Sequence, residues 1–163
     1  AEKGLDVLLR GLHRAGDPPF LVVGDGLLRE ALEGLARDLG LVNTRFLGWR
    51  PHHEVGELLS AARYVAIPSV GEETASLVAL EALAAARPLL VSEHGALPEL
   101  VAGGAGLVCR PGDEVDTSEK ILRFMQNDDL CRQASSEAAR AAQPFLSPTR
   151  HLADLEAVYR EVT

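Results

Sequence analysis

Short apolar runs alternate with amphipathic stretches along most of this chain, and this alternation limits the possible folds more than any other feature. Five runs have the length and composition of buried strands: Phe20–Val23, Arg45–Gly48, Tyr64–Pro68, Leu89–Ser92 and Gly106–Cys109. Helical spacing of leucine and alanine lies between them, over about Leu27–Leu39, Glu54–Ala62, Ala75–Ala86 and Pro98–Ala102. Apolar strands that alternate with helices indicate a parallel sheet covered on both faces. We therefore predict an α/β protein with a doubly wound, Rossmann-like sheet.

The C-terminal third of the chain has a helical pattern without strands. This pattern starts at Glu114 and is interrupted at Pro144 and Pro148. We expect one domain over residues 1–143 and a helical tail over residues 144–163, with the last helix over about Thr149–Val162.

Length and composition describe an ordinary globular domain. The chain has 163 residues, of which 47% are hydrophobic and 25% charged, and this composition argues against disorder. The net charge of −8 argues against a nucleic-acid partner, since phosphate contacts need clustered positive charge. Cys109 and Cys131 have no second pair beside them, so neither a zinc site nor a disulfide framework is indicated. No apolar run approaches the ~18 residues of a membrane-spanning helix.

The loops after the strands are where ligands bind in such a sheet. Four such loops follow the predicted strands: Gly24-Asp25-Gly26, Gly48-Trp49-Arg50, Pro68 to Thr74, and Ser92 to Ala96. The third leads into an alanine-rich helix, whose first N–H groups can bind phosphate. Its acidic residues Glu72 and Glu73 also have a simpler explanation, because carboxylates at a helix N-terminus stabilise it by about 0.3–1 kcal/mol each.

Glu81 is a carboxylate among apolar helical neighbours. The surrounding residues Val78 to Ala85 are otherwise apolar, so this helix is expected to be buried nearly all round. A buried carboxylate needs a partner or a polar cleft. Two alternatives remain open at this point: a structural ion pair with Arg87, or a position facing a ligand cleft.

A series of motifs occurs in one order along the chain. They are Val23 to Arg29, Phe46-Leu47-Gly48, Pro68-Ser69, Leu77 to Ala84, Arg87 to Ser92, Gly95 to Val101, and Pro111-Gly112-Asp113. Together they resemble the C-terminal, donor-binding domain of retaining glycosyltransferases of the GT-B fold, the group 1 (family 4-like) enzymes. The resemblance runs from about Lys3 to Asp113 and fades in the helical tail.

The resemblance implies roles for individual residues. Glu73 and Glu81 have the family's E-x7-E spacing, so Glu73 would be the catalytic residue and reach hydroxyls of the donor sugar, and Glu81 would bind the nucleotide ribose. Two vicinal hydroxyls suit a carboxylate acceptor. The donor diphosphate would meet the N–H groups of Thr74, Ala75, Ser76 and Leu77, together with the Lys3 ammonium.

The nucleotide base would lie near the loops after the first two strand runs. The resemblance places it by Gly48 and Trp49, with Gly24 also among the donor-binding residues. Without the resemblance, Lys3 would be read as a solvated terminal lysine and Trp49 as a surface or interface aromatic. No cofactor and no metal ligands are expected, because His52, His53 and His94 lack a third ligand at suitable spacing.

Two departures from the family pattern affect the expected activity. Thr74-Ala75-Ser76 stands where the family has Gly-Phe-Gly, and side chains there would crowd the sugar. Ala86 stands where the family has glycine, at a helix end. A non-catalytic nucleotide-sugar-binding module is therefore the alternative to a transferase, and an epimerase of the same fold is disfavoured.

The family pattern also includes a strand and an acceptor domain before Lys3. In the strand order 3-2-1-4-5-6, the strand that has no counterpart here would be central. We expect its place to be filled by residues upstream of Ala1, by a strand of a second copy in self-association, or, least favoured, by direct pairing of the Phe20 and Tyr64 strands. Without the acceptor domain the chain alone is expected to be inactive. The whole protein is expected to be cytoplasmic, with the acceptor domain bringing it to the inner membrane face.

Overall fold

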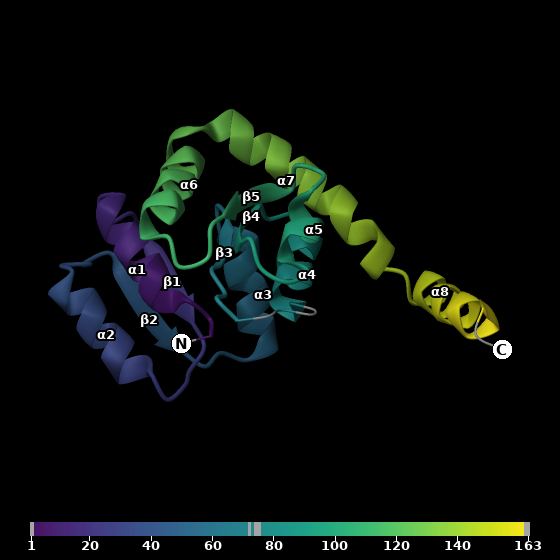
Figure 1. Cartoon of the computed structure of the whole chain (residues 1–163), viewed down its shortest axis with the longest axis horizontal. Helices are drawn as coiled ribbons and strands as arrows, with labels where there is room; N and C mark the ends of the chain where they lie inside the picture. The colour runs from purple at the N-terminus through teal and green to yellow at the C-terminus, as the bar shows by residue number, and fades with distance from the viewer. Residues whose placement is uncertain (1, 72, 74–75, 162–163) are drawn as a thin grey trace.

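The computed structural model describes residues 2–71, 73 and 76–161, and it confirms the α/β fold class (Figure 1). All its strands are parallel, and helices cover both faces of the sheets. The strands are β1 (Phe20–Val23), β2 (Thr44–Gly48), β3 (Val65–Ile67), β4 (Leu89–Ser92) and β5 (Gly106–Cys109). Both ends of each strand lie within one residue of the predicted ends, and the bounds of β1, β4 and β5 are the same as predicted.

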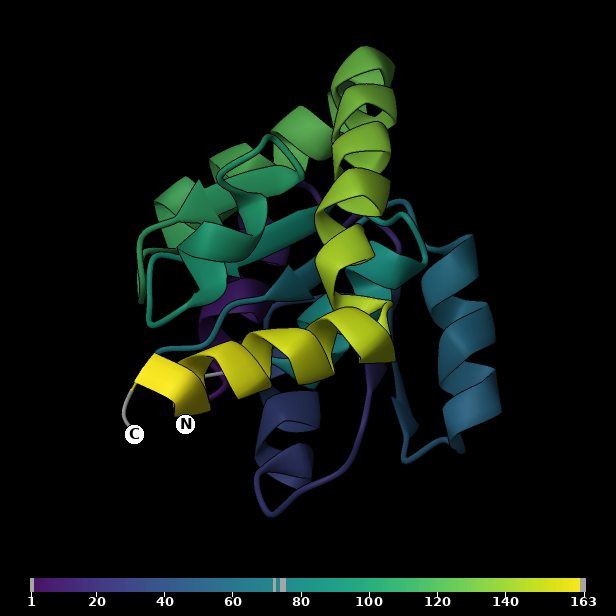
Figure 2. The same ribbon diagram turned by 90° about the vertical axis from the view of Figure 1, so that its right-hand side faces the viewer.

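The helices between the strands also lie close to the predicted ones. They are α2 (Arg29–Asp38), α3 (His52–Ala61), α4 (Leu77–Ala84) and α5 (Leu97–Val101). The C-terminal part contains α6 (Glu114–Gln126), α7 (Asp128–Ala142), the 3₁₀ turn η1 (Gln143–Phe145) and α8 (Pro148–Glu161). Figure 2 shows α8 running across the end of α7. Helix α1 (Leu5–Arg14) was not predicted.

The strands form two sheets rather than one. Their orders are β1-β2 and β3-β4-β5, which agrees with the predicted order on either side of the expected central strand. Within the described residues β1 and β3 share no hydrogen-bond ladder, so their direct pairing, the least favoured expectation, is not found. The rings of Phe20 and Tyr64, at the starts of these two segments, lie 6.4 Å apart between centroids. What occupies the strand position itself stays a prediction.

Two apolar cores, one on each face, hold the layers together. The first joins α1, α2 and α6 through Leu8, Ala36 and Phe124. The second joins α4, α5 and α7 to the other face of the β3-β4-β5 sheet. Strand β4 is buried on both faces, as continuous apolar strands predict, and its Leu90 enters the first core while Leu89 and Val91 enter the second.

Two expectations about burial were wrong. Strand β1 alternates instead of being covered throughout, since Leu21 and Val23 remain 44% and 40% exposed. Helix α4 buries only Ala79, Ala82 and Leu83, which face the sheet and α7. Its opposite side is open. An apolar sequence therefore did not mean a fully buried helix here.

Candidate functional site

The candidate site lies at the carboxyl ends of the parallel strands, where four loops come together in linked pairs. The Gly24 N–H after β1 donates to the Gly48 carbonyl at the end of β2, at 2.9 Å. The Ser92 hydroxyl at the end of β4 donates to the Ser69 carbonyl after β3, at 2.5 Å. The Ala96 N–H then donates to the Glu73 carbonyl at 2.9 Å, so the loop after β4 supports the backbone of the loop after β3.

The N-terminal segment packs on the loop after β3, and this contact brings Lys3 to Glu73. The Glu2 carbonyl accepts from the N–H groups of Val70 and Gly71 at 2.8 and 3.0 Å. Gly4 has φ +61°, and a Cβ there would lie 1.9 Å from the Pro68 carbonyl oxygen. Only glycine allows so close an approach. Residues 70 positions apart in sequence thus become neighbours.

Glu73 is the most highly constrained carboxylate of the site. Its Oε1 accepts from the Lys3 Nζ and, at 2.8 Å, from the Ser69 hydroxyl. The hydrogen bond from Lys3, with a smaller contribution from Ser69, holds the pKa of Glu73 below its usual value of 4.5 despite partial burial. The Glu73 side chain is 12% exposed and that of Lys3 is 77% exposed. Glu73 is therefore anionic at neutral pH, and Lys3 can reorient toward a ligand.

Glu73 lies between two cavities. One has a volume of about 280 Å³ and is lined by Glu2, Lys3, Gly71 and Glu73. The other, of about 210 Å³, is more apolar and is lined by Glu73, Ser76, Leu80, Ala96, Leu97, Glu99, Leu100 and Phe145. Both cavities lie by the loop that leads into α4. The carboxylate can therefore contact a ligand that occupies either one.

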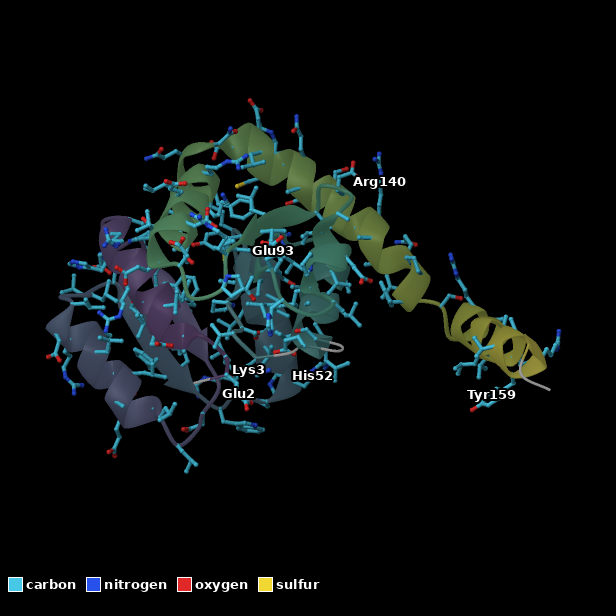
Figure 3. The ribbon with its side chains drawn as sticks, viewed as in Figure 1. Glu2, Lys3, His52, Glu93, Arg140 and Tyr159 are labelled. Atoms are coloured by element: carbon cyan, nitrogen blue, oxygen red, sulfur yellow. The ribbon has the colours of Figure 1, made fainter. Side chains whose placement is uncertain are left out.

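Glu81 is not part of an internal ion pair with Arg87. Arg87 instead donates to the carbonyls of Ala85 and Ala62, at 2.9 and 3.2 Å. The Glu81 side chain is 38% exposed, and its Oε1 lies 3.8 Å from Nδ1 of His52 at the start of α3. Figure 3 shows His52 on the same side of the view as Glu2 and Lys3. Of the two alternatives left open by the sequence, the ion pair with Arg87 is wrong.

The remaining predicted site residues divide into three sets. Ser76 precedes α4, is buried, and makes no side-chain cap, whereas Leu77 is 74% exposed in the first turn. Gly24 and Gly48 meet through their backbones, and the Trp49 side chain beside them is 71% exposed. Thr74 and Ala75, like Glu72, lie outside the described residues.

Three residues without a predicted function belong to this arrangement: Ser69 and His52 contact the predicted site residues Glu73 and Glu81, and Ser92 contacts Ser69. Ser69 and Ser92 were quoted only as parts of motifs, and His52 was assigned to a helix start. The available signal was position, since each serine follows an apolar run at the carboxyl end of a strand. Their hydrogen bonds depend on how two loops fold over each other, which the local sequence does not determine.

The described part of the chain contains neither a metal-ligand cluster nor a membrane-crossing helix. Its His, Cys, Asp and Glu side chains include no group of three that could hold a metal ion. None of its helices is both long enough and apolar enough to cross a membrane.

Comparison with known proteins supplies a family. The model of the family described as "Glycosyl transferases group 1" matches residues 1–141. A D-inositol 3-phosphate glycosyltransferase from Corynebacterium kroppenstedtii is 34% identical over 94% of this chain and 37% of its own length. An uncharacterized glycosyltransferase from Methanocaldococcus jannaschii is 27% identical over 99% of this chain and 46% of its own.

Solved structures agree with the fold. A sucrose-phosphate synthase from Thermosynechococcus elongatus superposes with a TM-score of 0.87 and 25% identity, over 99% of this chain and 42% of its own. The Anabaena protein HepE, solved with UDP and glucose, gives a TM-score of 0.83 and 26% identity, over 96% of this chain and 45% of its own. The chain thus spans less than half the length of these proteins.

Proposed function

Because this chain belongs to the group 1 glycosyl transferases, we propose that it is the donor-binding part of a retaining enzyme that transfers a sugar from a nucleotide sugar to an acceptor. One observation carries the proposal: Lys3 and Glu73 meet in a cavity of about 280 Å³ beside the start of α4. A cation, a carboxylate and a helix N-terminus are the groups that a sugar diphosphate requires. The diphosphate needs positive charge and N–H donors, and the sugar needs a hydroxyl acceptor.

In this proposal each residue takes the role that its chemistry suits. Lys3 and the first N–H groups of α4, with those of Thr74 to Ser76, bind the diphosphate. Glu73 is the catalytic residue and accepts from donor sugar hydroxyls. Glu81 accepts from the ribose, and Leu77 packs near the nucleotide. Gly24, Gly48 and the exposed Trp49 lie by the base, whose flat ring an indole can stack against.

In the chemical step the bond between the sugar and the diphosphate oxygen breaks, and a bond forms between the sugar and an acceptor hydroxyl, which loses its proton. The departing diphosphate gains negative charge. Lys3 and the α4 N-terminus would stabilise that charge, because their positive charge and dipole are already in place. The exposed Lys3 side chain allows the ammonium to move from Glu73 to a phosphate oxygen. Glu73 keeps the hydrogen bond from Ser69 and accepts from a sugar hydroxyl. This step requires no cofactor.

Two solved neighbours suggest the first donor to test. HepE was solved with UDP and with UDP-glucose, and its identity to this chain is 26–27% in those structures. We take UDP-glucose as the probe, with other nucleotide sugars as comparisons. Residues 1–143 would form the donor domain and residues 144–163 the tail. The acceptor would bind a domain outside this chain, and that domain would bring a cytoplasmic protein to the membrane face.

The proposal is tested by calorimetric titration followed by a transfer assay. The full-length protein should bind nucleotide sugars of one base in preference to others, and it should release the sugar to an acceptor or to water. The 163-residue chain alone should give no transfer. Binding without turnover by the full-length protein would instead support the non-catalytic alternative. No binding of any nucleotide sugar, or turnover by the chain alone, would contradict the proposal.

A further inference from the structure

Glu73 is held at its carboxylate by a hydroxyl that is itself buried. Ser69 is 1% exposed, and its Oγ lies 2.8 Å from Oε1 of Glu73. A buried hydroxyl has lost its water and must find a protein acceptor, so this hydrogen bond is not readily exchanged for another. The Lys3 ammonium on the same oxygen is different, because its side chain is largely exposed and free to rotate.

Ser69 is in turn fixed by a second buried serine on the neighbouring strand. Ser92, also 1% exposed, is the last residue of β4 and donates its hydroxyl to the Ser69 carbonyl. The carbonyl of Ser92 accepts from the His94 N–H at 2.8 Å, which ties the start of the next loop to the same residue. The two hydroxyls therefore connect the rigid end of β4 to the Glu73 side chain.

The arrangement uses only one of the two carboxylate oxygens. Both donors that the structure places on Glu73, from Ser69 and Lys3, are on Oε1. Among the described residues no donor is placed on Oε2. A carboxylate anchored through one oxygen presents the other in a fixed direction, which is what recognition of a sugar hydroxyl requires.

We propose that Ser69 and Ser92 are positioning residues, which form a two-hydroxyl relay that fixes Glu73 through Oε1 and leaves Oε2 to accept from the donor sugar. This inference rests on the proposed function, because it assigns a partner to the free oxygen. Ser69 acts directly on Glu73. Ser92 acts one step away, on the backbone of Ser69, so its loss has the same direction and a smaller size.

The first test compares a ligand that carries the sugar with one that lacks it. Ser69→Ala in the full-length protein should weaken UDP-glucose binding by about 10- to 100-fold, the effect of one hydrogen bond to a charged group. Its affinity for UDP should stay within about twofold, because UDP has no sugar hydroxyls. Equal weakening of both ligands, or no weakening of either, would overturn the proposal.

A double-mutant cycle separates positioning from a direct contact with the sugar. On a Glu73→Ala background, Ser69→Ala should cause no further loss of UDP-glucose affinity, since the carboxylate that it orients is gone. Ser118→Ala is the matched control: it removes another buried serine hydroxyl, in α6, away from this site. A full second loss in the Glu73→Ala background would show that Ser69 acts independently of Glu73.

A second measurement needs no ligand. The charged groups that share the two cavities with Glu73 are Glu2 and Lys3 on one side and Glu99 on the other, and none is changed in Ser69→Ala. Carbon-detected NMR of the Glu73 carboxyl should show a raised pKa in Ser69→Ala, because a donor to the charged form is lost, and no change in Ser118→Ala. An unchanged pKa would overturn the relay even if UDP-glucose is not the donor. Failure of the wild-type protein to bind either nucleotide, with the NMR shift present, would contradict only the proposed donor.

Discussion

Ala86 has a left-handed backbone, with φ +56°, one residue beyond the C-cap of α4. The Ala86 N–H donates to the Leu83 carbonyl and the Arg87 N–H to the Ala82 carbonyl. These are the two hydrogen bonds of a Schellman motif, which usually has glycine at this position. A Cβ in the left-handed region costs about 1–2 kcal/mol. The resemblance to the glycosyltransferase family identified Ala86 as unusual, and the left-handed backbone supplies the physical reason.

Replacing Ala86 by glycine should therefore stabilise the protein. We expect Ala86→Gly to raise the free energy of unfolding by about 1 kcal/mol, since relief of the strain exceeds the added entropy of the unfolded chain. Ala84→Gly is the matched control within the helical part of α4, and it should lower stability by about 0.5–1 kcal/mol. Denaturant unfolding measures both. A destabilised Ala86→Gly variant would contradict this account of the helix end.

Glu81 gives a prediction of the opposite kind, in which stability should not change. Its side chain is 38% exposed, and among the described residues the one basic side chain within 4 Å of its carboxylate is the exposed His52. Glu81→Gln should leave the melting temperature within about 1 °C, because surface pairs contribute little. It should weaken nucleotide binding in the full-length protein by about 1–3 kcal/mol through loss of a charged acceptor. Unchanged affinity with a large fall in melting temperature would return Glu81 to a structural role.

Glu73 and Glu81 show which features of the site can be predicted from the sequence. The spacing of the two glutamates is evident in the sequence, but a place for Lys3 in the same site was expected only from the family resemblance. The proximity of Lys3 to Glu73 depends on hydrogen bonds from Val70 and Gly71 to Glu2, which join segments far apart in the chain. Such long-range contacts cannot be predicted from the residues next to each other in the sequence. For the same reason, no role was predicted for Ser69 and Ser92.

At the scale of elements, the start of α6 is built on acidic residues with defined partners. Asp113 caps the helix by accepting from the Val115 and Asp116 N–H groups. Asp116 is 7% exposed and accepts from the Arg110 N–H at 2.7 Å and the Lys120 Nζ at 2.9 Å. Burial alone would raise the pKa of Asp116, but the hydrogen bonds from Lys120 and Arg110 hold it below its usual value of 3.8.

This environment predicts a pH-dependent contribution to stability. A carboxyl whose pKa is lower in the folded state stabilises fully above its unfolded value, here 3.8, and loses that contribution as the pH falls through the folded value. At pH 7, Asp116→Asn should cost about 1.5–3 kcal/mol. The difference from wild type should shrink steadily below about pH 4. A difference that stays constant from pH 7 to pH 2.5 in urea unfolding would show that charge is not involved.

Helix α1 was not predicted, although its residues have a helical pattern. Leu5, Leu8, Leu9 and Leu12 have helical spacing, and three of them are buried in the first core. Gly4 precedes the helix without a side-chain cap, so the usual Ser, Thr, Asp or Asn at the N-terminus is absent, and only Gly16, just after the C-terminus, follows the usual capping pattern. The strands were easier to predict, because each apolar run is bounded by turn residues that limit its length.

The two sheets predict that a further strand fits between them. The Glu2 carbonyl is bonded at the loop after β3, so a parallel strand joined ahead of Ala1 would end near that point. An extension of about five valine and isoleucine residues should raise the melting temperature by several degrees, because it pairs with the edges of β1 and β3 that have no strand partner among the described residues. A glycine–serine extension of equal length is the control and should have no effect.

Two outcomes of that experiment would contradict the prediction. Equal melting temperatures for the two extensions would show that no strand enters. A rise with both extensions would show that pairing is not its cause. A strand from a second copy of the chain is the other expected occupant. It would make the unextended chain sediment as a dimer, and its melting temperature would then depend on protein concentration.

At the scale of the whole molecule, two cores place all four ligand loops at one edge of the sheets. The opposite edge carries the connections from the helices back to the strands, including the contact of Asp17 with Val42 and Asn43. Helix α8 extends beyond the body of the domain and leaves Leu152, Leu155 and Val158 exposed (Figure 1). The fold class and the ligand edge followed from the order of apolar runs, because parallel strands align their carboxyl ends.

The central claim is that this edge binds a nucleotide sugar, and hydrogen exchange of the full-length protein tests it most directly. Addition of UDP-glucose, or of whichever nucleotide sugar binds in calorimetry, should slow amide exchange at residues 2–4, 24–26, 48–50 and 76–81. Residues 16–19, 40–43 and 102–105, at the opposite edge, should exchange as before. Protection confined to the opposite edge, or binding without protection of residues 2–4 and 76–81, would contradict the account.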